Sequence, residues 1–341
     1  MEQLTRRLKG ILIGGALGDA MGMPTELWTQ QMIQEEFPNG ITNFMPAMNK
    51  GSVLRDMIAG QVTDDTINTR FIIDMLVKHR GVIDVETYIE QLRIWSKDSQ
   101  LAELVSGPST RKALAMMDEG IPLSQTGRFG TTNGAAMKIA PIGMLADYRD
   151  MPDLVEKVQQ ICIPTHNTSV AIAGASSIAA AISYVASGKN DLNEMLEIAK
   201  QSIQLGMEKG YEVATASLSR RIETVIELVG KKEQNVVMNE LYDLWGTGVE
   251  TIETIPCVFA IVRLAEGSPI KAAQLAASLG GDTDTIGAIA AGICGGINPD
   301  FPSTVIETLE TVNELNFEGM AEAMVPFSPY YKADACADQI I

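Results

Sequence analysis

Two short acidic turns, about 220 positions apart in the chain, carry the residues whose types and spacing could do chemistry. The first is Thr63-Asp64-Asp65-Thr66, which opens a segment with apolar residues at helical spacing. The second is Gly280-Gly281-Asp282-Thr283-Asp284-Thr285, which runs into an apolar stretch of small residues typical of a buried helix. The two glycines allow the backbone to turn tightly before the carboxylates. If the turns meet in the fold, four aspartates converge on one spot and form a metal site.

Each acidic turn also has a purely structural interpretation, because Thr and Asp are favoured at helix N-termini. One side-chain acceptor is enough for a cap, however, and each turn offers more than one. Four clustered carboxylates repel one another: at ~5 Å and an effective dielectric near 20, each pair costs about 3 kcal/mol. Only cations or protons relieve that repulsion. Oxygen ligands without His or Cys favour magnesium, manganese or calcium over zinc.

The elements that must position these turns are helices. Apolar residues recur at helical spacing along most of the chain, and no run of alternating residues predicts a strand. The segments that we predict to be helical are 4–22, 66–79, 84–97, 109–119, 134–147, 152–162, 168–187, 191–208, 212–229, 251–265, 269–279, 285–296 and 303–313. Residues 28–62 show turn signals and no strong period, which predicts a long ordered loop. The patterns predict an all-α fold, with residues 1–341 forming a single compact multi-helix domain.

Two of these segments are unusual in composition. Segment 4–22 has a face of small residues that would let another backbone approach closely, formed by Gly14, Gly15, Gly18 and Gly22. The apolar run from Ala171 to Ser187 is mostly Ala and Ser. We predict that it is a buried helix and not a membrane span.

The charge balance excludes some classes of partner. The chain has 26 Lys and Arg against 43 Asp and Glu, which gives a net charge of −17. Such a field repels nucleic acid and anionic membranes, so we expect neither as a partner. A site for a phosphorylated substrate must then be locally cationic or built from backbone N–H groups. The four cysteines show no metal-binding spacing, and we expect reduced thiols in a cytoplasmic protein.

Several motifs occur in a fixed order along nearly the whole chain. In order they are Gly14-x-x-x-Gly18-Asp19-Ala20-x-Gly22-x-Pro24-x-Glu26, Thr63-Asp64-Asp65-Thr66, Asn133-Gly134-Ala135-Ala136-Met137, Thr165-His166 and Gly280-Gly281-Asp282-Thr283-Asp284-Thr285-x-Gly287-Ala288. Together they resemble the ADP-ribosylglycohydrolase family. The resemblance implies an all-helical hydrolase with a centre of two magnesium or manganese ions. It also implies cleavage of a glycosidic bond at the anomeric carbon of a ribose.

The resemblance assigns metal ligands by position. They are Thr63, Asp64 and Asp65 from the first turn, Asp282, Asp284 and Thr285 from the second, and Glu26 from the loop after the N-terminal helix. The aspartates also follow from the two turns alone, whereas Glu26 follows only from the resemblance, since it could equally be a solvated carboxylate. Asp64, Asp65 and Glu26 are the candidates for the catalytic base, and the sequence does not choose among them.

A second group of candidates could bind the rest of the substrate. The stretch from Gly127 to Gly134, including Gly130 and Asn133, precedes a predicted helix and offers backbone N–H groups to an anion. The resemblance places this stretch beside the diphosphate and distal ribose, and it makes His166 a ligand contact. The structural alternatives are an ordinary glycine-rich turn and a capping or buried histidine.

Two departures from the family pattern bear on the substrate. Lys138 stands where relatives often have Arg, which keeps the charge but loses the bidentate fork. The stretch before Gly107-Pro108 lacks an aromatic residue that relatives often carry. Three functions therefore remain open: hydrolysis of ADP-ribosylated protein, hydrolysis of a small free nucleoside or ribosyl metabolite at the same centre, and a non-enzymatic structural role. Filled ligand positions argue against the last of these.

Overall fold

A computed structural model of the protein describes residues 1–48, 50 and 54–331. These residues form helices and no β-strand, apart from one isolated bridge between Thr168 and Tyr211. The predicted all-α fold is therefore confirmed. The backbone contacts divide the described residues into two compact units, and each unit combines stretches that are distant in sequence. The expectation of a single domain stays a prediction.

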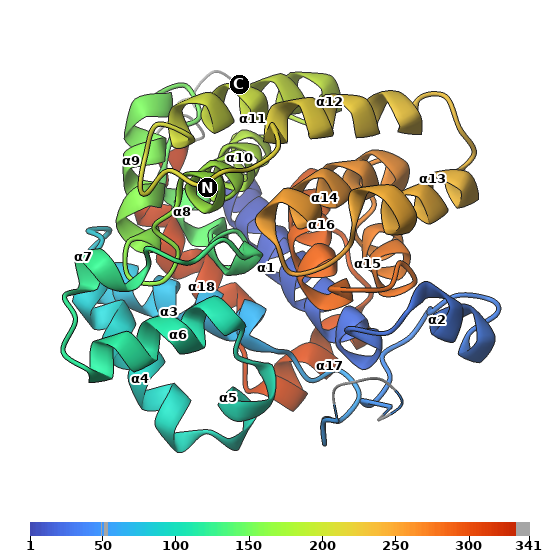
Figure 1. Ribbon diagram of the computed structural model, residues 1–341, viewed down its shortest axis with the longest axis horizontal. Coiled ribbons are helices and arrows are strands. Elements are labelled where there is room, and N and C mark those ends of the chain that lie inside the picture. Colours follow the sequence, from blue (N-terminus) through green and yellow to red (C-terminus); the bar gives the residue numbers. More distant parts are fainter. Residues whose placement is uncertain (49, 51–53, 332–341) are drawn as a thin grey trace. The chain divides into compact units, whose positions relative to one another are not determined.

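The first unit contains the described residues of 1–9, 67–215 and 317 onward. Its helices are α4 (Val85–Asp98), α5 (Gln100–Val105), α6 (Pro108–Asp118), α7 (Leu123–Thr126), η2 (Asn133–Ala135), α8 (Ala140–Leu145), α9 (Met151–Cys162), α10 (Ser169–Ala186), α11 (Leu192–Gly206), α18 (Phe317–Met324) and η4 (Val325–Phe327). Helix α10 packs against α8, α9 and α11 and forms the core (Figure 1). By length and composition α10 could cross a membrane, but all of its residues are buried inside the protein, as predicted for a core helix.

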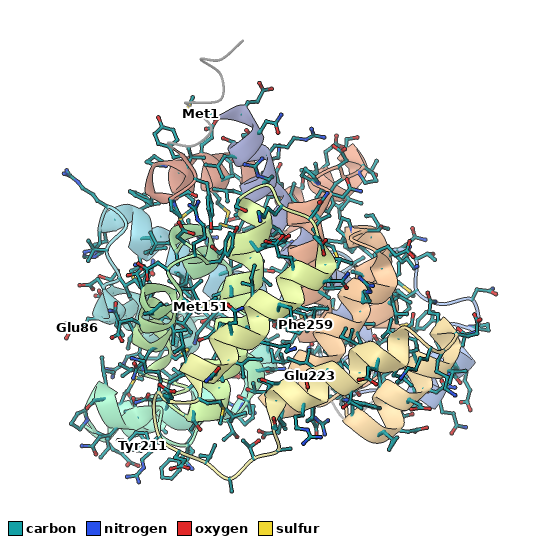
Figure 2. The ribbon with its side chains drawn as sticks, turned by 90° about the horizontal axis from the view of Figure 1, so that it is seen from above. Met1, Glu86, Met151, Tyr211, Glu223 and Phe259 are labelled. Carbon is teal, nitrogen blue, oxygen red and sulfur yellow. The ribbon has the colours of Figure 1, made fainter. Side chains whose placement is uncertain are left out.

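The second unit contains the described residues of 10–66 together with 216–316. Its helices are η1 (Met23–Thr25), α2 (Gln30–Glu36), α12 (Leu218–Val229), α13 (Gln234–Glu240), the π-helical turn η3 (Leu241–Trp245), α14 (Thr251–Ala265), α15 (Pro269–Ala277), α16 (Thr283–Ile297) and α17 (Ser303–Asn313). Helices α14, α15 and α16 pack together, and Phe259 of α14 is buried (Figure 2). Two further helices belong to both units: α1 (Glu2–Gly22) and α3 (Asp64–Lys78).

Glycines bring the backbones of α1 and α16 into direct contact in the second unit. A Cβ atom added to Gly14 would lie 2.1 Å from the Ala291 carbonyl oxygen, and one added to Gly18 would lie 2.0 Å from that of Gly287. Gly10 and Gly22 make equally close approaches, whereas a Cβ atom at Gly15 would have its nearest neighbour 3.8 Å away. The predicted small-residue face thus exists, but it consists of every fourth residue from Gly10 to Gly22 and does not include Gly15. Because no side chain separates the helices, the end of α1 lies close to the start of α16.

The helix predictions were wrong in several places for local reasons. The segment predicted at 134–147 is broken into η2 and α8, because Pro141 fits only the first turn of a new helix. The segment predicted from 212 begins at Leu218, where the Ser217 side chain caps the helix by accepting from Arg220 N–H. The predicted loop 28–62 contains α2, which is too short to show a period. Short helices α5, α7, α13 and α18 were missed for the same reason.

Candidate metal centre

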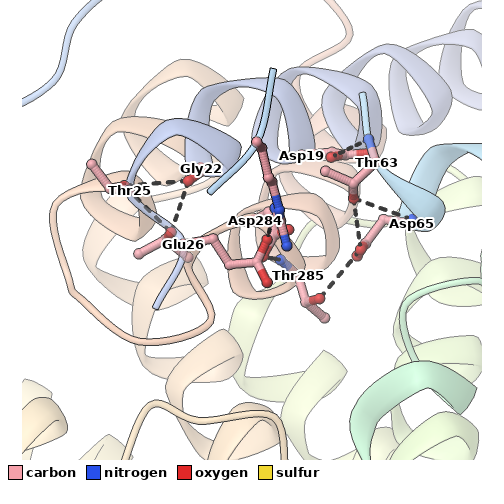
Figure 3. Close-up of polar contacts among 10 residues, drawn as sticks. Asp19, Gly22, Thr25, Glu26, Thr63, Asp65, Asp284 and Thr285 are labelled. Atoms are coloured by element: carbon pink, nitrogen blue, oxygen red, sulfur yellow. Dashed lines mark hydrogen bonds and ion pairs between the residues drawn. The ribbon is translucent and has the colours of Figure 1, made fainter. Parts of the chain in front are cut away.

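The two acidic turns meet, each at the start of a helix. Asp65 in the first turn of α3 accepts hydrogen bonds through Oδ2 from the hydroxyls of Thr63 and Thr285, both at 3.3 Å (Figure 3). Thr285 lies in the first turn of α16, together with Asp284. The other oxygen of Asp65, Oδ1, is buried and has no hydrogen-bond partner among the described residues. A buried carboxylate oxygen without a donor is costly unless a cation or proton satisfies it.

Asp19 holds the first turn in place. This residue of α1 is 0 % exposed. It accepts a hydrogen bond from the backbone N–H of Thr63 at 2.9 Å (Figure 3). It also accepts hydrogen bonds from the backbone N–H of Thr66 at 3.1 Å and from the Thr66 hydroxyl at 2.5 Å. The carboxylate therefore satisfies two of the free N–H groups at the start of α3. Asp19 belongs to the first sequence motif but was not predicted to have a role, although an acidic residue among the small residues of an apolar helix was a usable signal.

The backbone around Glu26 is fastened to the turn before Asp282. Leu27 N–H donates to the Gly281 carbonyl at 2.7 Å, and Gly281 N–H donates to the Trp28 carbonyl at 3.0 Å. Leu27 adopts a φ of 60°, a left-handed conformation that is uncommon for a leucine and marks local strain. Glu26 is thereby held beside Asp282 and Asp284: one ligand oxygen from each of the three carboxylates lies within 4.8 Å of the others.

The glycines before Asp282 have the conformational role that the sequence predicts. Gly280 and Gly281 have φ values of 87° and 79°, which side-chain-bearing residues rarely adopt. A Cβ atom on Gly281 would also lie 2.2 Å from the Thr247 carbonyl oxygen. The same carbonyl accepts a hydrogen bond from Asp282 N–H at 2.6 Å, which fixes where α16 begins.

Burial and mutual repulsion make the carboxyl groups of this centre difficult to ionise. Burial raises the pKa of Asp64 to about 7, and the nearby charges of Glu26 and Asp19 add to this effect. Burial also raises the pKa values of Asp65 and Asp284 well above the usual range, with further repulsion from neighbouring aspartates. The pKa of Glu26 is raised by burial and then by Asp284. These carboxylates need compensating positive charge to ionise together.

Arg55 supplies one positive charge to the centre and was not among the residues predicted from sequence. Its guanidinium Nη1 donates to Oε2 of Glu26, and only 7 % of the Arg55 side chain is exposed. Arg55 lies in the irregular segment between α2 and α3, where no periodic or motif signal marks it. All seven predicted metal ligands, together with Asp19 and Arg55, belong to the second unit. Their role as ligands and bases stays a prediction.

The predicted anion-binding residues belong to the first unit and pack against the turn at 163–167. A Cβ atom added to Gly127 would lie 2.3 Å from the Ile163 carbonyl oxygen, and one added to Gly130 would lie 2.2 Å from that of Thr165. At Gly134 the added atom would lie 2.8 Å from the His166 ring. Asn133 is buried at the start of η2. These glycines therefore have a packing reason of their own, and their role toward an anion stays a prediction.

His166 lies inside a buried polar cluster, which we define as Thr132, Lys138, Thr165 and His166. The histidine is 0 % exposed, and both ring nitrogens are hydrogen-bonded: Nε2 to the Thr132 hydroxyl at 3.1 Å and Nδ1 to the Thr165 hydroxyl at 2.8 Å. Lys138 Nζ donates to the same Thr165 hydroxyl at 3.1 Å. Burial, followed by the charge of Lys138, lowers the pKa of His166 well below its usual value, so the ring is neutral.

Comparisons with known proteins find relatives along nearly the whole chain. The family model described as ADP-ribosylglycohydrolase matches residues 1–328. The uncharacterised protein YegU of Escherichia coli (strain K12) is 35% identical over 95% of this chain and 97% of its own. Two named enzymes are more distant: ADP-ribosylhydrolase ARH3 of Xenopus tropicalis, 24% identical over 85% of this chain and 86% of its own, and ADP-ribosyl-[dinitrogen reductase] glycohydrolase of Rhodospirillum rubrum, 23% identical over 94% and 95%.

A solved structure shows the same fold. It is titled as an ADP-ribosylglycohydrolase-related protein complex, and it superposes with a TM-score of 0.69 at 20% sequence identity. The match covers 97% of this chain and 99% of that one.

Proposed function

The chain belongs to the ADP-ribosylglycohydrolase family, and from this membership we propose that it removes ADP-ribose from a modified amino-acid side chain. Membership makes the chain an enzyme that hydrolyses a glycosidic bond. The proposal also includes the ADP-ribosyl substrate, two bound Mg²⁺ or Mn²⁺ ions, and a cytoplasmic location. Buried free thiols at Cys162, Cys257 and Cys294 accord with the last of these.

One observation carries the metal-dependent part of the proposal: acidic side chains from three separate stretches converge in one buried place. Oxygens of Glu26, Asp282 and Asp284 lie within 4.8 Å of one another, and Asp65 Oδ1 has no donor in the described part of the chain. The donors are carboxylates and hydroxyls, which suit magnesium and manganese. The residues thus fit the ions that the family implies.

The ligand set follows from this arrangement. Two ions would be held by Glu26 and by the two turns, through the side chains of Thr63, Asp64, Asp65, Asp282, Asp284 and Thr285. When bound, the ions would orient the ribose hydroxyls and stabilise negative charge that develops on the attacking oxygen. Asp19 keeps the Thr63–Thr66 turn in position for this, and the bonds between Leu27 and Gly281 keep Glu26 beside α16.

Hydrolysis requires a base that accepts a proton from the attacking water. The water oxygen forms a bond to the anomeric carbon, the bond to the leaving group breaks, and the proton passes to a carboxylate. Asp64, Asp65 and Glu26 are the candidates. A base works best when its pKa lies near the working pH. Without an ion, burial raises the pKa of Asp64 to about 7, and bound cations would lower it from there.

An exposed cationic and aromatic patch favours a substrate that carries phosphate. Lys112 Nζ lies 3.8 Å from the centre of the Phe129 ring, and Arg128 lies 5.1 Å from the rings of both Phe129 and Tyr211. Phe129 is 50 % exposed. Neither cation has an acidic partner in the described part of the chain, although the protein carries a net charge of −17. Arg128 and Phe129 lie inside the predicted anion-binding stretch, and Arg128 with Lys112 makes this stretch locally cationic.

The second candidate function is hydrolysis of a free nucleoside or another small ribosyl metabolite. Lys138 favours it, because this cation is 1 % exposed and is held between Thr165 and the Tyr88 ring. A lysine in that position adds little to the binding of a phosphate in solvent.

An assay panel separates the two candidates. Purified protein is given ADP-ribosyl-arginine, ADP-ribosyl-serine and common nucleosides, with Mn²⁺ or with excess chelator. We expect release of ADP-ribose from an ADP-ribosylated side chain, lost with chelator and restored by Mn²⁺. Turnover of nucleosides alone would favour the second candidate, and turnover that survives chelation would contradict a metal-dependent centre.

A substrate analogue tests the role of the ribose hydroxyls. An analogue that lacks the 2″- or 3″-hydroxyl cannot chelate a metal through a cis-diol, so it should react far more slowly than its parent. Equal rates for the analogue and the parent would contradict the proposed mechanism even if the fold and family are right.

A further inference from the structure

Arg55 occupies a position in the acidic centre where a positive ion is needed. Its side chain is 7 % exposed and that of Glu26 is 12 % exposed, so their contact is nearly closed to solvent. The guanidinium donates from Nη1 to Oε2 of Glu26. A buried charge pair depends on its geometry and hydrogen bonds, and the loss of one partner destabilises the protein more than at the surface.

The influence of Arg55 extends beyond Glu26. The positive charge of Arg55 interacts with the carboxylates of Glu26, Asp284 and Asp64. These three carboxylates come from the loop after η1 and from the starts of α3 and α16. Arg55 therefore acts on all three stretches that build the centre.

Arg55 and a metal ion need the same ligand. One oxygen from each of Glu26, Asp282 and Asp284 lies within 4.8 Å of the others, an arrangement suited to one cation between them. Glu26 is already engaged by Arg55. A divalent ion that takes Glu26 as a ligand brings a second positive charge beside the guanidinium, and the repulsion between two cations in a buried site favours their separation.

We propose that Arg55 is an internal competitor for the metal: it binds Glu26 in the metal-free protein and releases Glu26 when a divalent ion enters the centre. The proposal rests on the metal-dependent part of the proposed function. Arg55 stabilises the metal-free centre by offsetting the repulsion among its carboxylates. It also weakens metal binding, because the ion must displace the guanidinium from Glu26.

The test compares Arg55→Gln with a matched control, Lys50→Gln. Lys50 lies in the same irregular segment and also pairs with a glutamate, Glu36, but at the surface, with 52 % of the Lys50 side chain exposed. Both substitutions remove one positive charge. Chelator-treated proteins are titrated with Mn²⁺ by calorimetry, and thermal unfolding is measured without metal and with saturating Mn²⁺.

Competition predicts a specific pattern. Arg55→Gln should bind Mn²⁺ about 10-fold more tightly than the wild type, within the 5–150-fold range typical of coupled binding equilibria. It should lower Tm without metal and leave Tm unchanged with saturating Mn²⁺, because the guanidinium no longer contacts Glu26 in the loaded protein. Arg55→Lys keeps the charge but not the forked geometry, so its affinity should lie between the two. Lys50→Gln should change neither quantity.

The outcomes separate this proposal from the proposed function. If the wild type binds Mn²⁺ but Arg55→Gln shows the same affinity, competition is overturned and the metal centre stands. An equal fall in Tm with and without Mn²⁺ would mean that Arg55 stays on Glu26 in the loaded protein, which also overturns competition. If the wild type takes up no Mn²⁺, the metal centre and the competition fail together. Should Arg55→Gln not fold without metal, Arg55→Lys decides by the same two measurements.

Discussion

The acidic centre of the second unit and the buried polar cluster of the first unit differ in whether their buried polar and charged groups have hydrogen-bond partners. In the cluster, both nitrogens of His166 and the ammonium of Lys138 have hydroxyl partners, and the lowered pKa of His166 keeps that ring neutral. In the centre, Asp65 Oδ1 has no donor among the described residues, and the carboxyl pKa values are raised. A satisfied cluster stabilises the fold as it stands, whereas a repulsive one stabilises it only with a ligand.

The largest effect that we expect from this comparison is loss of metal binding in Asp65→Asn. The substitution keeps the size of the side chain but removes a charge from the centre. Because loss of outer-shell partners already costs about 10–100-fold in metal affinity, loss of this charge should cost about 100-fold or more, with a comparable loss of activity. Calorimetry with Mn²⁺ measures the affinity, and thermal unfolding without metal should show no loss of stability, since repulsion is relieved.

Asp74→Asn is the matched control, because Asp74 lies on the same helix but is exposed and pairs with Arg70. It should leave metal affinity unchanged. If wild type and Asp65→Asn bind Mn²⁺ with equal affinity, the Asp65 carboxylate does not hold the ion, and the contrast with the polar cluster is wrong.

A second prediction concerns the backbone contact that brings the acidic residues together. Gly18→Ala places a Cβ atom 2.0 Å from the Gly287 carbonyl oxygen, so α1 and α16 must move apart. Overpacking of this kind typically costs about 1–3 kcal/mol, occasionally more, and we expect the upper end, with weaker Mn²⁺ binding because Asp19 moves with α1. Gly15→Ala is the control: its Cβ has 3.8 Å of space, and higher helix propensity should stabilise it by up to about 1 kcal/mol. Denaturant unfolding of both variants measures their stabilities. Equal stabilities would contradict the importance of the close contact between α1 and α16.

The third prediction concerns the polar cluster, where we expect a loss of stability and no change in metal affinity. Thr165→Val removes the hydroxyl that Lys138 and His166 share and keeps the side-chain shape. Leaving buried polar groups unsatisfied costs about 1–3 kcal/mol of unfolding free energy. Mn²⁺ affinity should not change, and Thr165→Ser should recover most of the stability. A change in Mn²⁺ affinity with no loss of stability would mean that the polar cluster contributes to metal binding and does not stabilise the fold.

The smallest expected effect is a difference in pH dependence. Groups with raised pKa values, such as Asp64 at about 7 and Asp19 at about 6, stabilise the fold at low pH and lose that contribution as pH rises through those values. Tm of chelated protein should therefore fall from pH 5 to pH 8 by a few degrees, since ~1 kcal/mol corresponds to about 2–4 °C in domains of 150–250 residues. Saturating Mn²⁺ should reduce the fall, and Asp64→Asn should flatten it.

The polar cluster acts in the other direction. His166 has a lowered pKa in the folded protein, so its contribution is lost as pH falls below the unfolded value near 6.5. A metal-free Tm that rises steadily from pH 5 to pH 8 would mean that the histidine outweighs the carboxylates.

Local signals explain which parts of this comparison could be predicted from sequence. Asp64, Asp65, Asp282 and Asp284 stand at helix starts beside threonines, and a local excess of carboxylates over what a cap needs is visible without a structure. A face of small residues on the first helix was visible for the same reason, although the prediction included Gly15 and omitted Gly10. The meeting of the two turns was a hypothesis, because nothing local joins positions about 220 residues apart.

The parts that could not be predicted depend on distant contacts. Arg55 lies in a segment without a period, and its importance comes only from where the chain folds back to Glu26. The glycines at 127, 130 and 134 predicted an anion site from sequence, but their packing against the 163–167 turn is visible only in three dimensions. Helix α8 was misplaced because the apolar spacing continues across Pro141, which in the structure lies in the first turn of a new helix.

The discontinuous second unit has a consequence for how the protein is made. Asp65 leaves the ribosome 217 residues before Asp282, and at synthesis rates of ~5–20 residues per second this delay is roughly 10–40 s. During that time the Gly14 and Gly18 face of α1 has no helix α16 to cover it. Nascent chains therefore pass through a stage in which the first acidic turn lacks its partner, and the proposed metal centre can form only after α16 has emerged.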